Sequence, residues 1–221
     1  MRSKCLWIVT LGILASGGAQ AQGLELRGSA DLYFPSSGLW ENQAWGGEIK
    51  LVHWYQDTTL GLGMALGYTR WKLSDNPVDQ TATRTDVLSG YADYMPVGIT
   101  ALSRGNLSDN TNFMVTVETG LYYMLCNESM RMTRYLDAGG GTTLTQTSAV
   151  SCEDGVVGRI GVGLELVIHD DRNPTTLFLN VGYQYDIDKG RLSGVGWTGY
   201  SQDARLEGGY LQFGVAIPLS Q

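Results

Sequence analysis

The sequence has few of the residues on which catalytic and metal sites are usually built. It contains only two histidines, His53 and His169, and three cysteines. Neither histidine lies in a spacing that indicates a serine–histidine–acid triad. The stretch from Asp186 to Gly190 resembles half of a calcium loop but is not followed by the later ligands. We therefore expect no catalytic residue, no bound metal, no cofactor and no enzymatic activity.

Basic residues and long apolar runs are also scarce. Lysine and arginine together number 15, against 22 aspartates and glutamates. An acidic chain of this kind argues against nucleic acid as a partner. No apolar run approaches the 18 residues typical of a transmembrane helix. No sustained helical periodicity is present either, so a helical membrane protein is excluded.

The N-terminus has the organisation of a secretory signal peptide. Arg2 and Lys4 precede a short apolar run at 6–15, and small residues stand at Ala19 and Ala21. This pattern predicts a signal peptide over residues 1–21, cleaved after Ala21, and a single domain over residues 22–221. Without the signal peptide, 13 basic residues face 22 acidic ones, which gives a net charge of −9.

Most of the remaining chain alternates between apolar and other residues with a period of two. Eight such segments are present, and each predicts a strand. They span residues 24–34, 47–56, 59–71, 86–95, 112–126, 156–168, 176–187 and 208–217. Strands of soluble proteins usually have about five or six residues. A tilted strand needs about 9–11 residues to cross a bilayer, so these lengths favour transmembrane strands.

The connections between these segments alternate in length. Strands two and three, and six and seven, are joined by short polar stretches, whereas the longest connection runs from Asn127 to Asp154. Long loops on one side and tight turns on the other are typical of bacterial outer-membrane barrels. The join at 96–110 is longer than this pattern favours. The sequence thus predicts an all-β fold, an eight-stranded antiparallel up-and-down transmembrane β-barrel with long external loops and mostly short periplasmic turns.

Aromatic residues fall near the expected strand ends, as the two girdles of a membrane barrel require. On the loop side we expect Tyr33, Phe34, Trp45, Tyr68, Trp71, Tyr122, Tyr123, Tyr183 and Tyr185. On the turn side we expect Tyr55, Tyr94, Phe113 and Phe178.

With these features the whole mature chain resembles the small eight-stranded outer-membrane β-barrel family, the type of the outer-membrane protein A transmembrane domain. The resemblance rests on architecture rather than on a sharp motif. Members often end on an aromatic residue, whereas this chain ends in GVAIPLSQ and its nearest aromatic is Phe213. The resemblance implies an outer-membrane location, contact with membrane lipid and with the assembly machinery, a monomer, and a structural or surface-interaction role.

In these segments the charged residues alternate with the apolar ones, so the two kinds lie on opposite faces of each predicted strand. If the apolar phase faces lipid, the lumen holds Glu25, Arg27, Asp31, Glu48, Lys50, Glu118, Arg159, Glu165 and Asp186. An eight-stranded barrel is only wide enough for side chains to fill it, and confined charges must pair. We expect a lumenal salt-bridge network that includes a pair between Glu118 and Arg159, because their strands are neighbours. The network would form a polar plug, with a conducting pore as the alternative.

Two cysteines remain in the mature chain, since Cys5 lies within the signal peptide. Cys126 and Cys152 bracket the longest connection and enclose 25 residues. In an exported protein such an even pair predicts a disulfide, and two free thiols are the alternative.

Four functions fit these observations. The first is a non-enzymatic outer-membrane barrel whose external loops contact an extracellular or host ligand. A small porin-like channel, a lipid-modifying barrel enzyme and a soluble secreted ligand-binding barrel are the others. No membrane-level serine or histidine with an acidic partner can be identified for the enzyme. The alternation itself is compatible with an apolar phase that faces either outward or inward.

Overall fold

The computed structural model describes residues 21–55, 59–74, 77–81, 83–107, 112–137, 143–168, 175–194 and 201–219. All but the last residue of the predicted signal peptide lie outside these ranges, and its cleavage remains a prediction. Within them, no helix has the length and apolar character needed to span a membrane.

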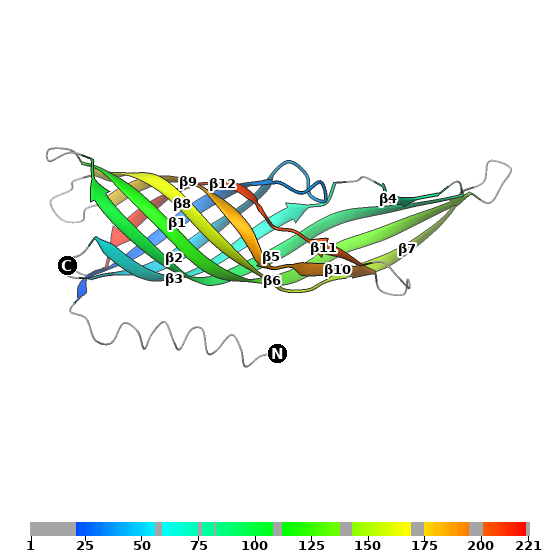
Figure 1. Cartoon of the computed structure of the whole chain (residues 1–221), viewed down its shortest axis with the longest axis horizontal. Coiled ribbons are helices and arrows are strands. Elements are labelled where there is room, and N and C mark those ends of the chain that lie inside the picture. Colours follow the sequence, from blue (N-terminus) through cyan, green and yellow to red (C-terminus); the bar gives the residue numbers. More distant parts are fainter. Residues whose placement is uncertain are drawn as a thin grey trace.

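Eight long strands close into an antiparallel barrel (Figure 1). They are β1 (Ala21–Pro35), β2 (Ala44–Tyr55), β3 (Leu60–Lys72), β5 (Arg84–Asn106), β6 (Phe113–Asp137), β8 (Gly155–Ile168), β9 (Thr175–Asp188) and β12 (Gly208–Pro218). Each strand pairs with the next in this order, and β1 pairs with β12 from Glu25 to Pro35. The closed barrel confirms the predicted fold class.

The apolar phase of these strands faces outward and the charged phase faces the lumen. Exposed side chains include Ile49 (60%), Ile160 (55%) and Phe213 (58%), whereas Arg27, Lys50 and Arg159 are at most 3% exposed. A soluble barrel would show the opposite arrangement, because its exterior must be hydrated. This orientation removes the soluble ligand-binding barrel from the alternatives and leaves an apolar belt for lipid.

The external connections, which were expected to be long loops, contain paired strands. Residues 127–154 contain the second half of β6 and all of β7 (Thr143–Cys152), which pair from Met130 to Asp137. The other connections form β4 (Pro77–Gln80), β10 (Gly190–Gly194) and β11 (Ser201–Ala204). Together with the outer parts of β5 and β6 these strands form the external sheet, in the order β11-β10-β7-β6-β5-β4. It extends along the long axis of the molecule beyond the barrel (Figure 1).

Strand β5 accounts for the length of the join at 96–110. The strand runs on to Asn106 and stays paired with β6 along its whole length. Alternation continues through this stretch: Val97 and Ile99 face outward, whereas Thr100 and Leu102 are buried. The connection to β6 therefore begins only at Leu107, and it lies on the turn side as the barrel pattern requires.

Only part of the expected aromatic girdle faces the membrane. Phe34, Trp45, Tyr68, Tyr183 and Tyr185 are exposed on the outer face, as predicted for the loop side. Other aromatic residues predicted for the girdles point into the barrel and are at most 3% exposed: Tyr33, Trp71, Tyr94, Tyr122 and Phe178. The assignment of these five was wrong, because strand-end position alone does not tell which face a residue takes.

An apolar core extends from the loop-side half of the barrel into the external sheet. Its buried members include Trp71, Leu88, Tyr94, Met124 and Met132. The first external loop contributes Trp40, whose ring lies 5.7 Å from that of Trp71 and whose Nε1 donates to the carbonyl oxygen of Arg205 at 2.6 Å. Trp40 therefore joins this loop to the apolar core and to the segment around Arg205.

The predicted disulfide between Cys126 and Cys152 is present at the base of the β6–β7 hairpin. We expect a Cys126→Ser, Cys152→Ser variant to lose about 3 kcal/mol of stability in this hairpin, the entropic value for a loop of this size. Limited proteolysis of the folded protein in detergent measures it, with cleavage expected within residues 127–151 while the barrel stays intact. Equal protease resistance of variant and wild type would contradict a stabilising role.

An ion pair in the external sheet predicts sensitivity to acid. Arg134 Nε and Nη2 donate to the two carboxylate oxygens of Asp86 at 2.8 and 2.9 Å. These hydrogen bonds, with Arg84 nearby, hold the pKa of Asp86 below its ordinary value of 3.8. The stabilisation is therefore full above the ordinary value and is lost as the pH falls through the lowered one.

For this partly exposed pair we expect a contribution of about 1 kcal/mol to the stability of the external sheet. An Asp86→Asn variant should lack this contribution at every pH. Cleavage by an acid-active protease across the acidic range measures the effect. Wild type should approach the variant only below the ordinary pKa. A constant difference down to the most acidic condition would rule out Asp86 as the titrating group.

Candidate functional site

The first layer of lumenal charges lies near the middle of the barrel and joins strands from opposite walls. Lys50 Nζ lies 3.0 Å from Glu48 Oε1 and also pairs with Glu118. Arg159 Nη1 donates to Glu48 Oε2 at 2.7 Å. All four side chains are at most 4% exposed. We call Glu48, Lys50, Glu118 and Arg159 the middle layer.

The expected pair between Glu118 and Arg159 was wrong. On the adjacent strands β6 and β8, Glu118 lies opposite Gly161 and Arg159 lies opposite Gly120. Side chains that leave neighbouring strands on the same face point in the same direction, toward the far wall. In a barrel this narrow they therefore meet β2, which supplies Glu48 to Arg159 and Lys50 to Glu118.

Neutral groups complete the middle layer. Thr100 Oγ1 donates to Glu118 Oε1 at 3.0 Å, and Arg159 Nε donates to Gln184 Oε1 at 2.8 Å. The guanidinium of Arg159 lies 4.1 Å from the ring centroid of Tyr122. These contacts add partners to charges that would be costly to leave unpaired inside the barrel.

The second layer lies toward the turn side. Arg27 Nη1 contacts Glu25 Oε1 at 3.1 Å, and Arg27 Nη2 contacts Glu165 Oε1 at 2.7 Å. Arg104 Nη2 lies 2.9 Å from Glu25 Oε2, and Arg104 Nε lies 2.8 Å from Glu165 Oε2. Two arginines and two glutamates thus form a closed ring of four ion pairs. We call Glu25, Arg27, Arg104 and Glu165 the inner layer.

Aromatic rings pack against both arginines of the inner layer. The guanidinium of Arg104 lies 4.0 Å from the ring centroid of Trp54, and that of Arg27 lies 4.3 Å from the centroid of Phe178. The planar guanidinium groups therefore stack on apolar surfaces while their edges bind carboxylates, a combination that lysine cannot reproduce. This packing fills the lumen beside the ion pairs.

Sequence reasoning missed Arg104 because it ended the fourth strand at Met95. The signal was present in the stretch after Pro96, where the period of two continues to Arg104. With the strand extended, Arg104 falls on the same face as the buried Thr100 and Leu102. Strand length therefore decided whether this arginine was assigned to the lumen.

Two of the expected lumenal carboxylates stand apart from the layers. Asp31 is buried and accepts hydrogen bonds from Ser29 Oγ at 2.7 Å and from Tyr33 Oη at 3.2 Å. Asp186 lies at the loop-side rim, where its Oδ1 accepts from the backbone nitrogen of Leu206 at 3.1 Å. Among the described residues Asp186 forms no ion pair with the charged side chains of either layer.

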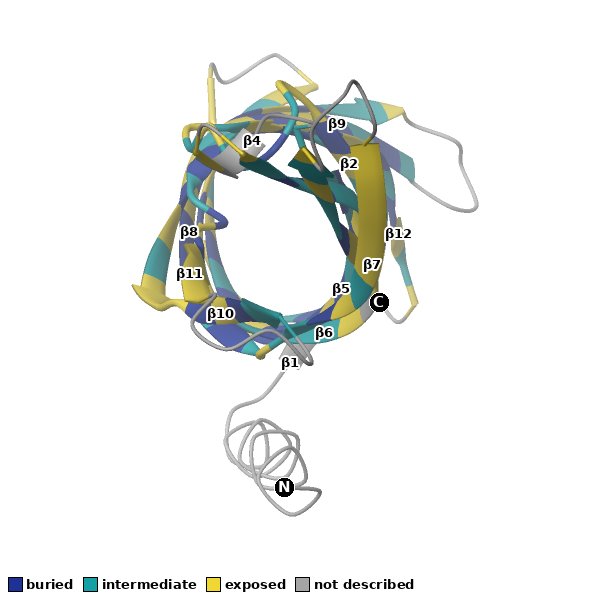
Figure 2. Cartoon of the chain, turned by 90° about the vertical axis from the view of Figure 1, so that its right-hand side faces the viewer, coloured by how far each residue is buried: buried dark blue, intermediate teal, exposed yellow. Residues whose placement is uncertain are grey.

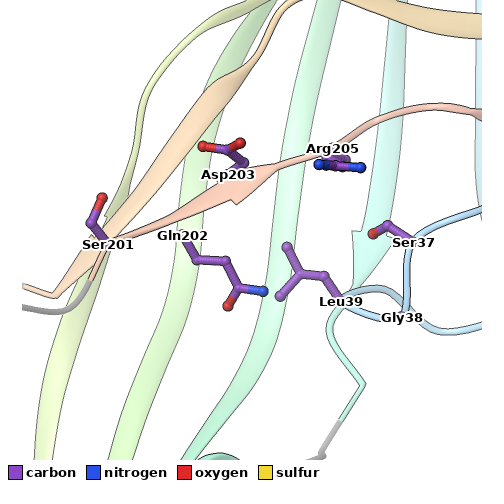
Figure 3. Close-up of a pocket in the computed structure, with 7 residues that line it drawn as sticks. All are labelled: Ser37, Gly38, Leu39, Ser201, Gln202, Asp203 and Arg205. Carbon is purple, nitrogen blue, oxygen red and sulfur yellow. The ribbon is translucent and has the colours of Figure 1, made fainter.

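A hollow lies on the external side, between the first loop and β11 (Figure 3). Its volume is about 620 Å³. The lining residues are Ser37, Gly38, Leu39, Ser201, Gln202, Asp203 and Arg205. The hollow is open, and Leu39 lines it together with serine, glutamine, aspartate and arginine side chains. Within the described ranges no group of three metal-ligating side chains occurs, here or elsewhere.

Comparison with known proteins gives a likeness in structure only. No protein-family model matches the chain, and no curated protein sequence matches it. The outer membrane protein OprG from Pseudomonas aeruginosa superposes with a TM-score of 0.59 at 9% identity, over 92% of this chain and 99% of that chain. A major outer membrane protein from Thermus thermophilus gives 0.51 at 11% identity, over 89% and 99%. The chain therefore has the fold of the small eight-stranded outer-membrane β-barrels.

Proposed function

We propose that the protein is a non-enzymatic barrel of the bacterial outer membrane that displays the external sheet on a sealed support. The single observation that carries this proposal is the pair of ion-pair layers, which cross the lumen inside a barrel with an apolar exterior. Export would use the predicted signal peptide, and insertion would use the outer-membrane assembly machinery. The barrel would act as a monomer within its membrane.

The sealed lumen is supported by three consecutive fillings along the barrel. The inner layer occupies the turn side, the middle layer occupies the centre, and the apolar core with Trp40 occupies the loop side. Because an eight-stranded barrel has room only for side chains, these fillings support a lumen without a continuous water path. The porin-like alternative requires an opening through both charged layers.

The external sheet supports the surface-interaction role. It continues from β5 and β6 without a break in pairing, so its position is fixed by the barrel rather than by a flexible loop. A contact surface held by a hydrogen-bonded sheet loses little conformational entropy on binding. The sheet and the hollow beside β11 are therefore the places where an extracellular ligand would bind.

Membrane fractionation with gel electrophoresis tests the proposal. Cells that produce the full chain should carry it in the outer-membrane fraction, and unboiled and boiled samples should migrate differently in detergent. A protease added to intact cells should cleave the external sheet and leave the barrel strands. Equal mobility, or protein confined to the soluble fraction, would contradict the proposal.

A further inference from the structure

Among the described residues, one edge of β7 has no pairing strand from Thr143 to Thr147. From Thr143 to Thr147 the strand pairs with β6 on one side, and its pairing with β10 begins only at Val150. Both faces of this stretch are exposed, as the yellow colour of β7 in Figure 2 shows. In the part of the chain that the structure describes, no strand covers this edge. Backbone groups on such an edge can pair with another strand.

This edge lacks the features that normally prevent such pairing. Proteins protect exposed edges with lysine, proline, bulges or inward-facing charge. The stretch Thr143-Leu144-Thr145-Gln146-Thr147 contains no charge, no proline and no glycine. Its surroundings are nearly neutral as well, since residues 84–90, 130–137 and 143–149 together contain three arginines and two aspartates. The net charge of −9 on the mature chain would repel a second copy at other surfaces. At this sheet the repulsion is small, because the residues around the edge are nearly neutral.

The sequence of the edge is complementary to itself. If two copies pair antiparallel about Thr145, each Thr143 lies opposite Thr147, each Leu144 lies opposite Gln146, and the two Thr145 residues lie opposite each other. All threonines then share one face and form cross-strand pairs, which are favourable in antiparallel sheets. A foreign strand would need a matching sequence, whereas a second copy supplies it without further conditions.

The direction of β7 determines where the second copy must be. Strand β7 runs obliquely along the long axis of the molecule (Figure 1), and in the proposed orientation this axis crosses the membrane. Antiparallel pairing therefore requires two molecules that point in opposite directions. Neighbours in one membrane point the same way, so their β7 strands run parallel and cannot form this pairing. Two molecules in facing membranes satisfy the geometry.

We propose that the β7 edge binds the β7 edge of a second copy in a facing outer membrane, and so joins two cells. This inference rests on the proposed function, because it needs the external sheet to lie outside the cell. A pair of five-residue strands is weak alone, since isolated two-stranded sheets are marginally stable. Many copies on two surfaces act together, so weak pairs add up to firm attachment.

Substituting Thr145 with lysine or with glutamate tests the pairing, because Thr145 lies opposite the Thr145 of the second copy in the predicted register. Cells that produce wild-type protein, Thr145→Lys or Thr145→Glu are labelled with two dyes and mixed, and aggregates are counted by microscopy. Thr83→Lys is the matched control, since Thr83 is also exposed and lies before β5, away from the β7 edge. Surface protease cleavage and heat-dependent gel mobility verify that each protein is folded and displayed.

Wild-type cells and Thr83→Lys cells should aggregate. Thr145→Lys cells alone and Thr145→Glu cells alone should lose aggregation, because like charges oppose each other across the strands. A mixture of the two variants should regain it, in aggregates that contain both dyes. Aggregation of Thr145→Lys cells at the wild-type level, or dispersed mixtures of Lys and Glu cells, would overturn the inference. Folded, displayed wild-type protein on dispersed cells would overturn it too, whereas absence from the surface would instead refute the proposed function.

Discussion

Replacing Glu48 with glutamine is expected to destabilise the folded barrel by about 3–5 kcal/mol, the cost of removing one partner from a buried ion pair. Glu48 accepts from Arg159 and contacts Lys50 in the middle layer, and all three side chains are at most 3% exposed. In the variant Arg159 keeps Gln184 and the ring of Tyr122 but has no carboxylate among the contacts described. Lys50 still has Glu118, so Arg159 accounts for most of the loss.

The measurement is the urea midpoint of unfolding in detergent micelles, followed by the heat-dependent gel shift. Glu41→Gln is the matched control, because Glu41 forms an ion pair with Lys72 in which both side chains are about 40% exposed. Surface pairs of this kind contribute about 0–1 kcal/mol. If Glu48→Gln and Glu41→Gln shifted the midpoint equally, the middle layer would not stabilise the barrel.

Removing both arginines that bridge the lumen should open it to ions. An Arg27→Ala, Arg159→Ala double variant deletes one guanidinium from each charged layer. Each single variant leaves the other layer intact, so we expect the effect only in the double variant, and only if the apolar core with Trp40 does not close the lumen by itself. The remaining lumenal carboxylates are Glu25, Asp31, Glu48, Glu118 and Glu165, and the remaining cations are Lys50 and Arg104. Confined negative charge of this kind favours cations.

Planar-bilayer recordings test this prediction. The double variant should show ohmic steps, with a reversal potential in a salt gradient that indicates cation selectivity. An Arg27→Lys, Arg159→Lys variant keeps both charges and should conduct less. If the folded double variant stayed silent, the arginines would not be what closes the lumen, and the apolar core with Trp40 would be the seal.

Much of the fold could be predicted from the sequence because a transmembrane barrel constrains every strand. Alternation, strand length and turn spacing each follow from the bilayer, so they identify the eight barrel strands independently of any contact. The external part is not constrained in this way. Residues 127–154 were expected to form a loop, yet Thr143, Thr145 and Thr147 belong to a strand that is exposed on both faces. Without a buried face, the apolar signal of a strand is missing.

The lumenal charges show a second limit. Their position inside the barrel followed from alternation, but their partners did not. Because their strands are adjacent in the sheet, Glu118 was expected to pair with Arg159. In the structure Arg159 instead pairs with Glu48 on the opposite wall. Partners across a lumen depend on barrel diameter and on the stagger between strands, and neither property is written in any one segment. Alternation therefore predicts which residues face inward, but closure of the sheet decides which of them meet.

Single-channel recording of the wild-type protein in a planar bilayer tests the central claim most directly. The protein is purified in detergent, its folded state is verified by the heat-dependent gel shift, and it is inserted into the bilayer. The two ion-pair layers and the apolar core predict a silent trace with no ohmic steps. Steady ohmic steps from the folded wild type would contradict a sealed lumen.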